Sequence, residues 1–375
     1  MIDYVEIRNT ETELAGIIDT AKSIIWHSAY FGVGDFEIYT QATPEAREIL
    51  KKYNYVTRPD NPEIGIIEKI DISDSNIDGL MITASGRFAK SILDRRLIYN
   101  LSGTSNSATI LRGKVETEVR KIVSNNAISC AFDSRRNIPL LELGAISNIP
   151  LVIVDDNGNA TQKQVSYDNL LEYSDRVLQE YGLSARVILD AERKKLQYVV
   201  SVGADRSVNN SDGNDPIIFS SDFDNLVSSA YSIDTTQEKN VALIGGAGEG
   251  TARFYSLLAG SEIGLARREV WIDASSISKT YKDDSEDEQT YTDAEYKSFL
   301  DEKGKQEMSA MNVVDDFNGV LDVTNGNWIY NRDFFLGDIV TVESSRIGVY
   351  MDVRILQVTE VQDENGYTVA VDYQN

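Results

Sequence analysis

The sequence predicts an α+β protein with two β-barrel domains that carry helical and small α/β insertions. Three observations lead to this prediction. The first ninety residues contain short segments in which apolar and polar side chains alternate, which is the period of a strand. Over residues 86–125 and again over residues 167–181, apolar residues recur at helical spacing. From Pro216 to the end, alternating segments dominate again, so we expect sheet-rich domains on both sides of a helical region.

The opening region is predicted to form short strands separated by turn residues at the spacing of a barrel or sandwich. The predicted strands cover residues 4–8, 13–19, 24–31, 36–40, 65–73 and 80–85. Residues 44–53 are predicted to form a helix, because Thr43 is a favourable N-cap and proline fits the first helical position. We expect residues 1–90, together with strands from about 135–165, to form the first β-barrel domain.

The middle of the chain is predicted to be an insertion, made of residues 91–134 and 166–202. An apolar stripe begins at Phe88, and further helices are predicted over residues 107–125 and 167–181, the latter capped by Ser166 and stopped by Gly182. Residues 185–189 and 196–202 are predicted to pair as a hairpin. Residues 156–159 are predicted to form a hairpin turn within the extended stretch.

Residues 203–375 are predicted to form the second β-barrel domain, with an acidic loop and a helix inserted at about 280–312. Thr292 and Glu295 form the pattern of a capping box at the start of that helix. The last strands are predicted over residues 336–342, 348–361 and 367–373. We place them in the same sheet as the opening strands, where they would close a barrel.

The glycine-rich stretch around residue 246 resembles a nucleotide-binding loop but lacks its deciding residues. Glycines stand at positions 245, 246, 248 and 250, whereas the dinucleotide spacing needs glycine where Thr251 lies, and no Gly-Lys-Ser/Thr follows. Residues 267–273 alternate as a strand rather than a helix. We therefore predict a glycine-hinged β-meander, with Gly246 and Gly248 in or beside strands.

Composition argues against several classes of function. Lysine and arginine number 36 and aspartate and glutamate 60, so the formal charge is −24, which disfavours binding to nucleic acid. The single Cys130 and single His27 leave no intramolecular disulfide and little material for zinc binding or histidine catalysis. The sequence opens with a strand pattern rather than a secretion signal, and it lacks an apolar run of membrane-spanning length. We expect folding in a cytoplasm.

The sequence offers no motif for catalysis. It contains no Gly-x-Ser-x-Gly elbow, no His-Glu-x-x-His pair and no Cys–His pair. Residues 283–288 form an acidic run, but without a glycine turn they resemble a solvated loop more than a cation site. We therefore predict no catalytic, cofactor-binding or metal-binding residues and no enzymatic activity. Trp26, Trp271 and Trp328 could bind carbohydrate, but core or interface positions are the commoner use.

A series of short segments in a fixed order resembles a known family. The segments in the first half are Gly86, Ser91-Ile92-Leu93-Asp94-Arg95-Arg96, Ile122-Val123-Ser124-Asn125-Asn126 followed by Arg135 or Arg136, and Tyr198 to Ser207. Those in the second half are Ile218-Phe219-Ser220, Asp224-Asn225-Leu226, Asn240-Val241-Ala242, Gly246, Gly248, Arg268-Glu269, Asp273-Ala274 and Leu336-Gly337-Asp338. Together they resemble the siphovirus ReqiPepy-type tail protein family of phages and prophages, nearly end to end.

The resemblance implies a structural protein of a phage, prophage or tailocin tail. Such baseplate or tail-tip hubs cap the distal tail tube, and their subunits carry two barrel-like domains, so that three subunits match a sixfold tube. It implies a homotrimer at the virion tail tip, assembled in the host cytoplasm, with tube or distal tail, tape-measure and other baseplate proteins as partners. DNA would pass through the lumen without specific binding. The alternatives are a tail-associated cell-wall hydrolase and a host-glycan receptor-binding module.

Overall fold

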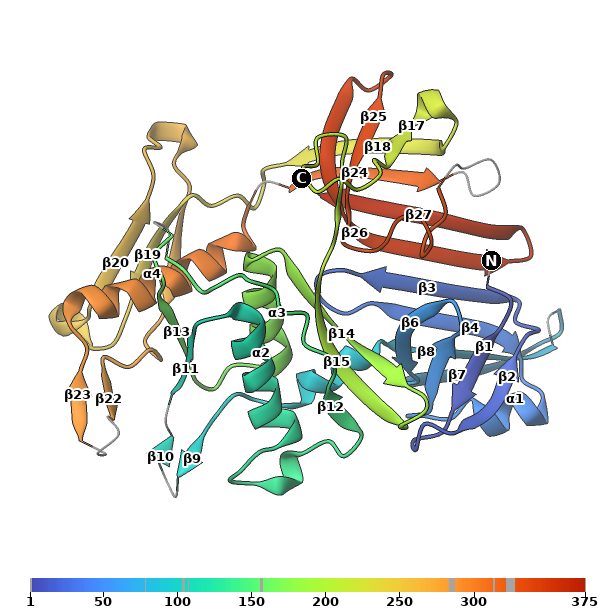
Figure 1. Ribbon diagram of the computed structural model, residues 1–375, viewed down its shortest axis with the longest axis horizontal. Coiled ribbons are helices and arrows are strands. Elements are labelled where there is room, and N and C mark those ends of the chain that lie inside the picture. The colour runs from blue at the N-terminus through green and yellow to red at the C-terminus, as the bar shows by residue number, and fades with distance from the viewer. Residues whose placement is uncertain are drawn as a thin grey trace.

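The fold of this computed structural model is built mainly from strands, with four α-helices among the residues described. The structure describes residues 2–77, 79–102, 105–106, 108–155, 158–282, 287–312, 314–321 and 328–374. Strands from both ends of the chain lie side by side, α2 (Val115–Val123) and α3 (Leu170–Glu180) lie next to each other near the middle, and α1 (Pro44–Ile49) and α4 (Asp293–Ser309) lie on opposite sides of the molecule (Figure 1). The predicted α+β class is confirmed.

A seven-stranded sheet joins the N-terminal strands to the predicted hairpin. Its order is β12 (Leu141–Leu143), β15 (Lys195–Val202), β14 (Leu183–Asp190), β6 (Asn61–Ile66), β5 (Tyr55–Arg58), β1 (Val5–Arg8) and β2 (Leu14–Ile18). The β14–β15 hairpin is confirmed, and β14 meets β6 where Ile188 pairs with Glu63. The predicted helix after Thr43 is shorter than expected, since α1 spans Pro44–Ile49 and residues 55–58 form β5.

A larger sheet connects the opening strands to the closing ones. Its main path is β18 (Leu226–Asp234), β24 (Val314–Leu321), β27 (Gly366–Gln374), β26 (Val349–Asp363), β3 (Ser23–Ala29), β4 (Asp35–Gln41), β8 (Gly79–Arg87) and β7 (Lys69–Ser75). A further strand, β25 (Ile339–Ser344), pairs with β26 and with β16 (Asp205–Arg206) and β17 (Ile218–Ser220).

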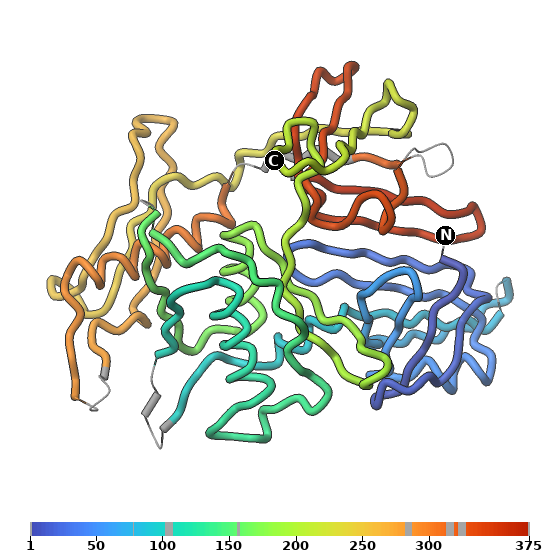
Figure 2. Tube along the Cα trace, viewed as in Figure 1, coloured from blue at the N-terminus to red at the C-terminus, as the bar shows by residue number. Residues whose placement is uncertain are grey.

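The strand β26 is fifteen residues long and belongs to both halves of this sheet. Its first part pairs with β25 and its last part with β3, where Glu360 lies opposite Trp26. The prediction that the last strands share a sheet with the opening stretch is therefore confirmed. Figure 2 shows the C-terminal strands beside the N-terminal strands. Neither sheet closes on itself within the described ranges, so the two predicted barrels are not confirmed. The division into domains also stays a prediction.

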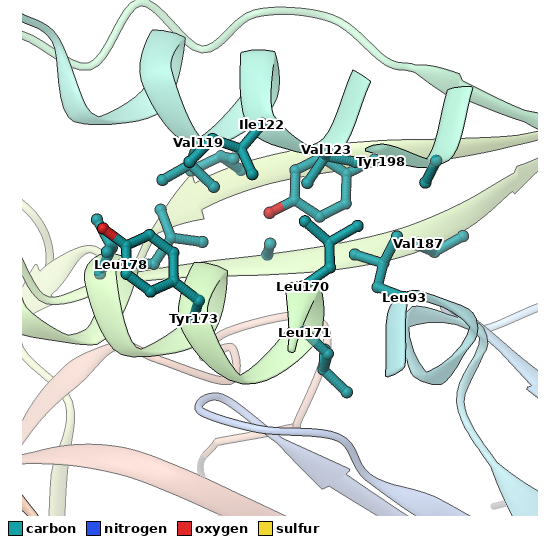
Figure 3. Packing of buried hydrophobic residues seen from close by; sticks show 14 of the residues in the cluster. Leu93, Val119, Ile122, Val123, Leu170, Leu171, Tyr173, Leu178, Val187 and Tyr198 are labelled. Carbon is teal, nitrogen blue, oxygen red and sulfur yellow. The ribbon is translucent and has the colours of Figure 1, made fainter. Parts of the chain in front are cut away.

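The helical region packs two α-helices and a sheet around the largest core. Helix α2 (Val115–Val123) continues as a π-helical turn (Ser124–Ile128), and α3 (Leu170–Glu180) lies against it. Figure 3 shows Val119 and Ile122 of α2, Leu170 of α3 and Tyr198 of β15 converging on one apolar interior. The stripe that begins at Phe88 forms a 3₁₀ helix, Ala89–Arg95.

Two predicted helix starts in this region are wrong. The helix predicted from residue 107 begins only at Val115, because residues 109–112 form β11, which pairs with β13 (Gln162–Val165), and Gly113 has a φ of 110°. Residue 107 itself lies outside the described residues, as do residues 156–157 of the predicted turn. Helix α3 is capped by Asn169 rather than Ser166, because its side chain accepts the N–H groups of residues 171 and 172.

A small unit formed by residues 240–309 stands apart from the two main sheets (Figure 1). Its three strands have the order β20 (Tyr255–Ala259), β19 (Val241–Gly245) and β21 (Glu269–Asp273), and helix α4 (Asp293–Ser309) covers one face. The predicted meander is wrong in one respect, since β21 runs parallel to β19. Short hairpins complete the fold, namely β9 (Leu101–Ser102) with β10 (Ser105–Asn106) and β22 (Thr280–Lys282) with β23 (Glu288–Thr290).

The capping box predicted for α4 is confirmed and gives a direct test. The Thr292 hydroxyl accepts the Glu295 N–H, and the Glu295 side chain accepts the Thr292 N–H. Thr292→Ala should lower the free energy of unfolding by about 1 kcal/mol, measured by urea denaturation. Thr290→Ala, on the neighbouring exposed strand, is the matched control and should change little.

Candidate functional site

His27 and Cys130 are the residues whose side chains are best suited to catalysis, but both contact neighbouring side chains within the fold. The His27 ring nitrogens contact Asp35 Oδ2 at 3.3 Å and Gln357 Oε1 at 3.2 Å, which places the ring between neighbouring strands. Cys130 is buried, and its Sγ contacts Arg136 Nη1 at 3.8 Å. Within the described ranges, no group of three or more His, Cys, Asp or Glu side chains could hold a metal ion. Residues 283–286 of the acidic run lie outside those ranges.

The three tryptophans are spread over the fold. Trp26 is fully buried between Phe36 and Phe88, Trp271 is half-exposed on β21, and Trp328 packs against the core of the C-terminal strands. They form no shared binding surface. In the part of the chain that the structure describes, no helix is long and apolar enough to cross a membrane.

The glycine-rich loop connects two strands, as predicted. Gly245 ends β19 and Gly246 follows it directly, while Gly248 lies in the turn before β20. A Cβ on Gly246 would lie 2.7 Å from the Tyr296 hydroxyl of α4, so this glycine allows the helix to approach the sheet. Arg253 donates to the carbonyl oxygens of Gly245 and Gly246 at 3.2 and 3.0 Å. A three-residue 3₁₀ turn, Gly250–Ala252, and then β20 follow, rather than the α-helix that a phosphate-binding loop requires.

A pair of glycines brings the start of β25 against the chain that leaves β15. A Cβ on Gly203 would lie 1.8 Å from the Gly337 carbonyl oxygen, and one on Gly337 would lie 2.1 Å from the Tyr30 ring. The Tyr30 hydroxyl donates to the Gly182 carbonyl oxygen at 3.0 Å and accepts the Gly203 N–H at 3.1 Å. This Gly203–Gly337 junction therefore links the helical region, β3 and the C-terminal strands.

A buried carboxylate fixes the same junction. Asp338 accepts the Ala204 N–H at 2.9 Å, the Phe335 N–H at 2.9 Å and the Arg206 Nε–H at 3.0 Å. Burial raises the pKa of Asp338, and the two backbone donors and Arg206 oppose that rise. Two of the segments singled out in the sequence, Gly203–Ser207 and Leu336–Asp338, thus meet at this junction.

A second junction forms around Arg136. Its guanidinium donates to the Leu97 carbonyl oxygen and to Asn126 Oδ1, and it stacks 3.9 Å from the centre of the Tyr99 ring. Arg96 Nε donates to the Arg136 carbonyl oxygen at 2.7 Å. The segments around Arg96, Asn126 and Arg136 therefore contact one another, as the segments around Gly203 and Gly337 do.

Two asparagines fasten loops in the C-terminal half. Asn225 accepts the Ser220 N–H at 2.7 Å and donates to the Ile218 carbonyl oxygen at 2.8 Å. Asn240 accepts the Arg268 N–H at 2.8 Å and donates to the Ala266 carbonyl oxygen at 2.7 Å. In both cases two of the singled-out segments contact each other, so these residues act by holding backbone rather than by chemistry.

A buried charge cluster that the sequence patterns do not predict lies between the two sheets. Arg58 on β5 binds Glu360 on β26 with two hydrogen bonds of 2.9 Å, and both side chains are almost fully buried. Asp60 also accepts from Arg58, and the Tyr367 hydroxyl donates to Glu360 at 2.6 Å. Burial and then the Glu360 charge raise the pKa of Tyr367. A charged residue that ends an apolar run of β5 is the only local signal, and it does not indicate a partner 302 residues away.

A second missed carboxylate, Glu63 on β6, gives a pH-dependent prediction. It is buried and accepts the Ser28 hydroxyl at 2.6 Å, and desolvation raises its pKa above the ordinary 4.5. The folded protein therefore holds this proton to higher pH than the unfolded chain. Its contribution to stability is present below pH 4.5 and is lost as the pH rises through the raised value.

Glu63→Gln should consequently raise the urea midpoint at pH 7 to 8, and the gain should shrink as the pH falls toward 4.5. Glu68→Gln is the control of opposite sign, because hydrogen bonds from Arg87 lower the pKa of Glu68. That variant should lose stability at neutral pH. A pH-independent gain for Glu63→Gln would contradict the prediction.

Comparison with known proteins identifies the family of this chain. The family model described as Siphovirus ReqiPepy6 Gp37-like protein matches residues 4–372. The chain belongs to the Siphovirus ReqiPepy6 Gp37-like family. The family resemblance predicted from the sequence is thereby confirmed, and none of the curated proteins matches the chain.

Two solved structures share the fold of this chain. The 43 kDa tail protein of prophage MuSo2 from Shewanella oneidensis is 14% identical, with a TM-score of 0.58 over 99% of this chain and 98% of that chain. A tail protein from Neisseria meningitidis MC58 is 13% identical, with a TM-score of 0.55 over 99% and 96%. The Gp37-like chain and these proteins share one fold over nearly their full lengths.

Proposed function

We propose that this chain is a structural protein of a phage or prophage tail that forms a hub at the distal end of the tail tube. The observation that carries the proposal is the match of nearly the whole chain to the Gp37-like family, supported by the fold shared with two prophage or bacterial tail proteins. The resemblance to tail-tip hubs supplies the finer position. In this proposal, three copies surround the axis, and barrel-like halves contact the tube.

The geometry is consistent with a role in assembly rather than catalysis. The buried polar groups of the junctions bind one another and hold loops and sheets in place. Asp338 and Arg206 tie β16 to β25, and Arg58 and Glu360 tie β5 to β26. A protein that works as a fixed part of a larger particle needs this kind of internal rigidity.

Electron microscopy of purified tails tests the proposal. An epitope inserted after Asp212, in an exposed turn between β16 and β17, provides a label away from the junctions. We expect labelled antibody only at the tube end distal to the capsid. Label along the tube or on side fibres would refute the hub position, and untagged tails control for antibody specificity.

A further inference from the structure

A basic pocket lies between the seven-stranded sheet and the 3₁₀ helix η1 (Ala89–Arg95). The pocket has a volume of about 330 Å³, and Arg95 and Arg96 stand on its wall. Acidic residues make up 60 of the 375 residues in the chain, yet none lines this pocket. A local excess of positive charge in so acidic a protein indicates a site for a carboxylate.

The two arginines of the pocket are only partly satisfied by acceptors of the same chain. Arg96 binds only the carbonyl oxygens of Arg95 and Arg136, through Nη1 and Nε, and its Nη2 has no partner within the described ranges. Burial lowers the pKa of Arg96, and the charges of Arg136 and Arg95 lower it further. Arg95 reaches one carboxylate, Glu68, at 3.5 Å.

Apart from Thr10, Asn137 and two tyrosines, the remaining wall of the pocket is apolar. Ile66, Ile92 and Leu196 contribute side chains, so a small inorganic anion would leave most of the surface uncovered. A volume of about 330 Å³ lies near the lower end of ligand pockets. The matching ligand is therefore an aliphatic side chain with a carboxylate next to it.

The same chain carries such a group on the loop between β20 and β21. Ile263 is 82% exposed and Leu265 fully exposed, although aliphatic side chains of this size are costly to leave in water. Glu262 precedes them; its Oε2 is folded back over Gly260, where it is buried and has no hydrogen-bond partner among the described residues, so the carboxylate must turn outward to meet another chain. Residues 260–266, which we call the aliphatic loop, thus combine a carboxylate with exposed aliphatic side chains. These are the two groups that the pocket is suited to bind.

We infer that the aliphatic loop of one copy inserts into the Arg95–Arg96 pocket of a second copy, with Glu262 facing the two guanidinium groups. Within one chain the two features lie in different parts of the fold, since the loop projects beyond β19 and β20 while β6 and β15 lie near the other sheets (Figure 1). A contact between unlike surfaces of identical chains is head-to-tail, and such contacts close a ring when the rotation between neighbouring copies closes. This inference rests on the proposed function for the setting in which copies meet.

A synthetic peptide tests the contact on the intact protein. Acetyl-Gly-Ser-Glu-Ile-Gly-Leu-Ala-amide, which copies residues 260–266, should bind the full chain in a calorimetric or NMR titration. Replacing its glutamate by glutamine, or its isoleucine by serine, should weaken binding at least about tenfold. Equal binding of all three peptides would overturn the inference. No binding at peptide concentrations up to about 10 mM, which is on the order of the weakest specific affinities, would overturn it as well.

Variants of the protein locate the site. Arg96→Gln and Arg95→Gln should each weaken the peptide about tenfold, whereas Arg193→Gln, an exposed arginine paired with Glu142, should not. Circular dichroism checks that each variant is folded, and Arg96→Lys should recover part of the affinity. Loss of affinity only in Arg193→Gln, or in none of the variants, would contradict the assignment.

Crosslinking then tests the contact between full chains. In a Cys130→Ser background, Tyr53→Cys with Leu265→Cys should yield disulfide-linked oligomers under mild oxidation, whereas Tyr53→Cys with Ile347→Cys should not. Oligomers that form equally in both pairs would refute the contact. The tail-labelling experiment can succeed or fail separately, so the two proposals are distinguishable.

Discussion

Replacing Arg58 by methionine should lower the free energy of unfolding by about 3 to 5 kcal/mol, because the change leaves Glu360 buried without its cation. The pair is almost fully buried, so water cannot replace the two lost hydrogen bonds of 2.9 Å. The measurement is the urea midpoint, followed by tyrosine and tryptophan fluorescence. Trp26 lies beside the Arg58 guanidinium and reports on the site.

Adding Glu360→Gln to this variant separates charge from packing. The double variant should recover part of the lost stability, since it no longer buries an unpaired carboxylate. Arg332→Met is the matched control, because Arg332 forms an exposed pair with Asp333 and should contribute little. Equal losses for Arg58→Met and Arg332→Met would show that the buried pair does not stabilise the fold.

Gly337→Ala should lower the free energy of unfolding by more than about 4 kcal/mol or prevent folding altogether. The added Cβ would overlap the Tyr30 ring at 2.1 Å, and the φ of 93° disfavours alanine. The ring cannot retreat easily, because its hydroxyl binds Gly182 and Gly203. Soluble yield and thermal midpoint are the measurements.

Gly348→Ala is the control that isolates the backbone contribution. Its φ of 77° is also positive, but a Cβ there would meet nothing within 4 Å. We expect a loss of roughly 1 to 2 kcal/mol from backbone strain alone. If the two variants lose the same stability, the close approach to Tyr30 is not what requires glycine at position 337.

A helix or strand is predictable from the sequence where the local pattern fits only one type of secondary structure. The β14–β15 hairpin follows from two alternating runs around a short polar turn, and the start of α4 follows from Thr292 and Glu295. The segment 109–112 is ambiguous, because Ile110 and Leu111 fit both a strand and a helix. Its partner β13 decides the outcome, and that partner lies about fifty residues later.

The contacts that fix the overall arrangement are not predictable from local patterns. Gly203–Ser207 and Leu336–Asp338 both stand out in the sequence, but nothing in either segment indicates that Arg206 binds an aspartate 132 residues away. The same holds for Arg58 and Glu360, which are charged residues in two strands that lie far apart in the sequence. Burial of a charge becomes interpretable only once its partner is placed beside it.

The length and pairing of β26 determine how the molecule responds to force. One end of this strand is bonded to β25 and the other end to β3, and β27 runs along its opposite edge. A force that pulls β3 and β25 apart along the strand direction acts in shear on the hydrogen bonds that join them to β26. Many of these bonds then carry the load at the same time. A peeling force would break such bonds one after another. The single continuous strand therefore makes the connection between the two halves of the sheet mechanically stiff along its own axis.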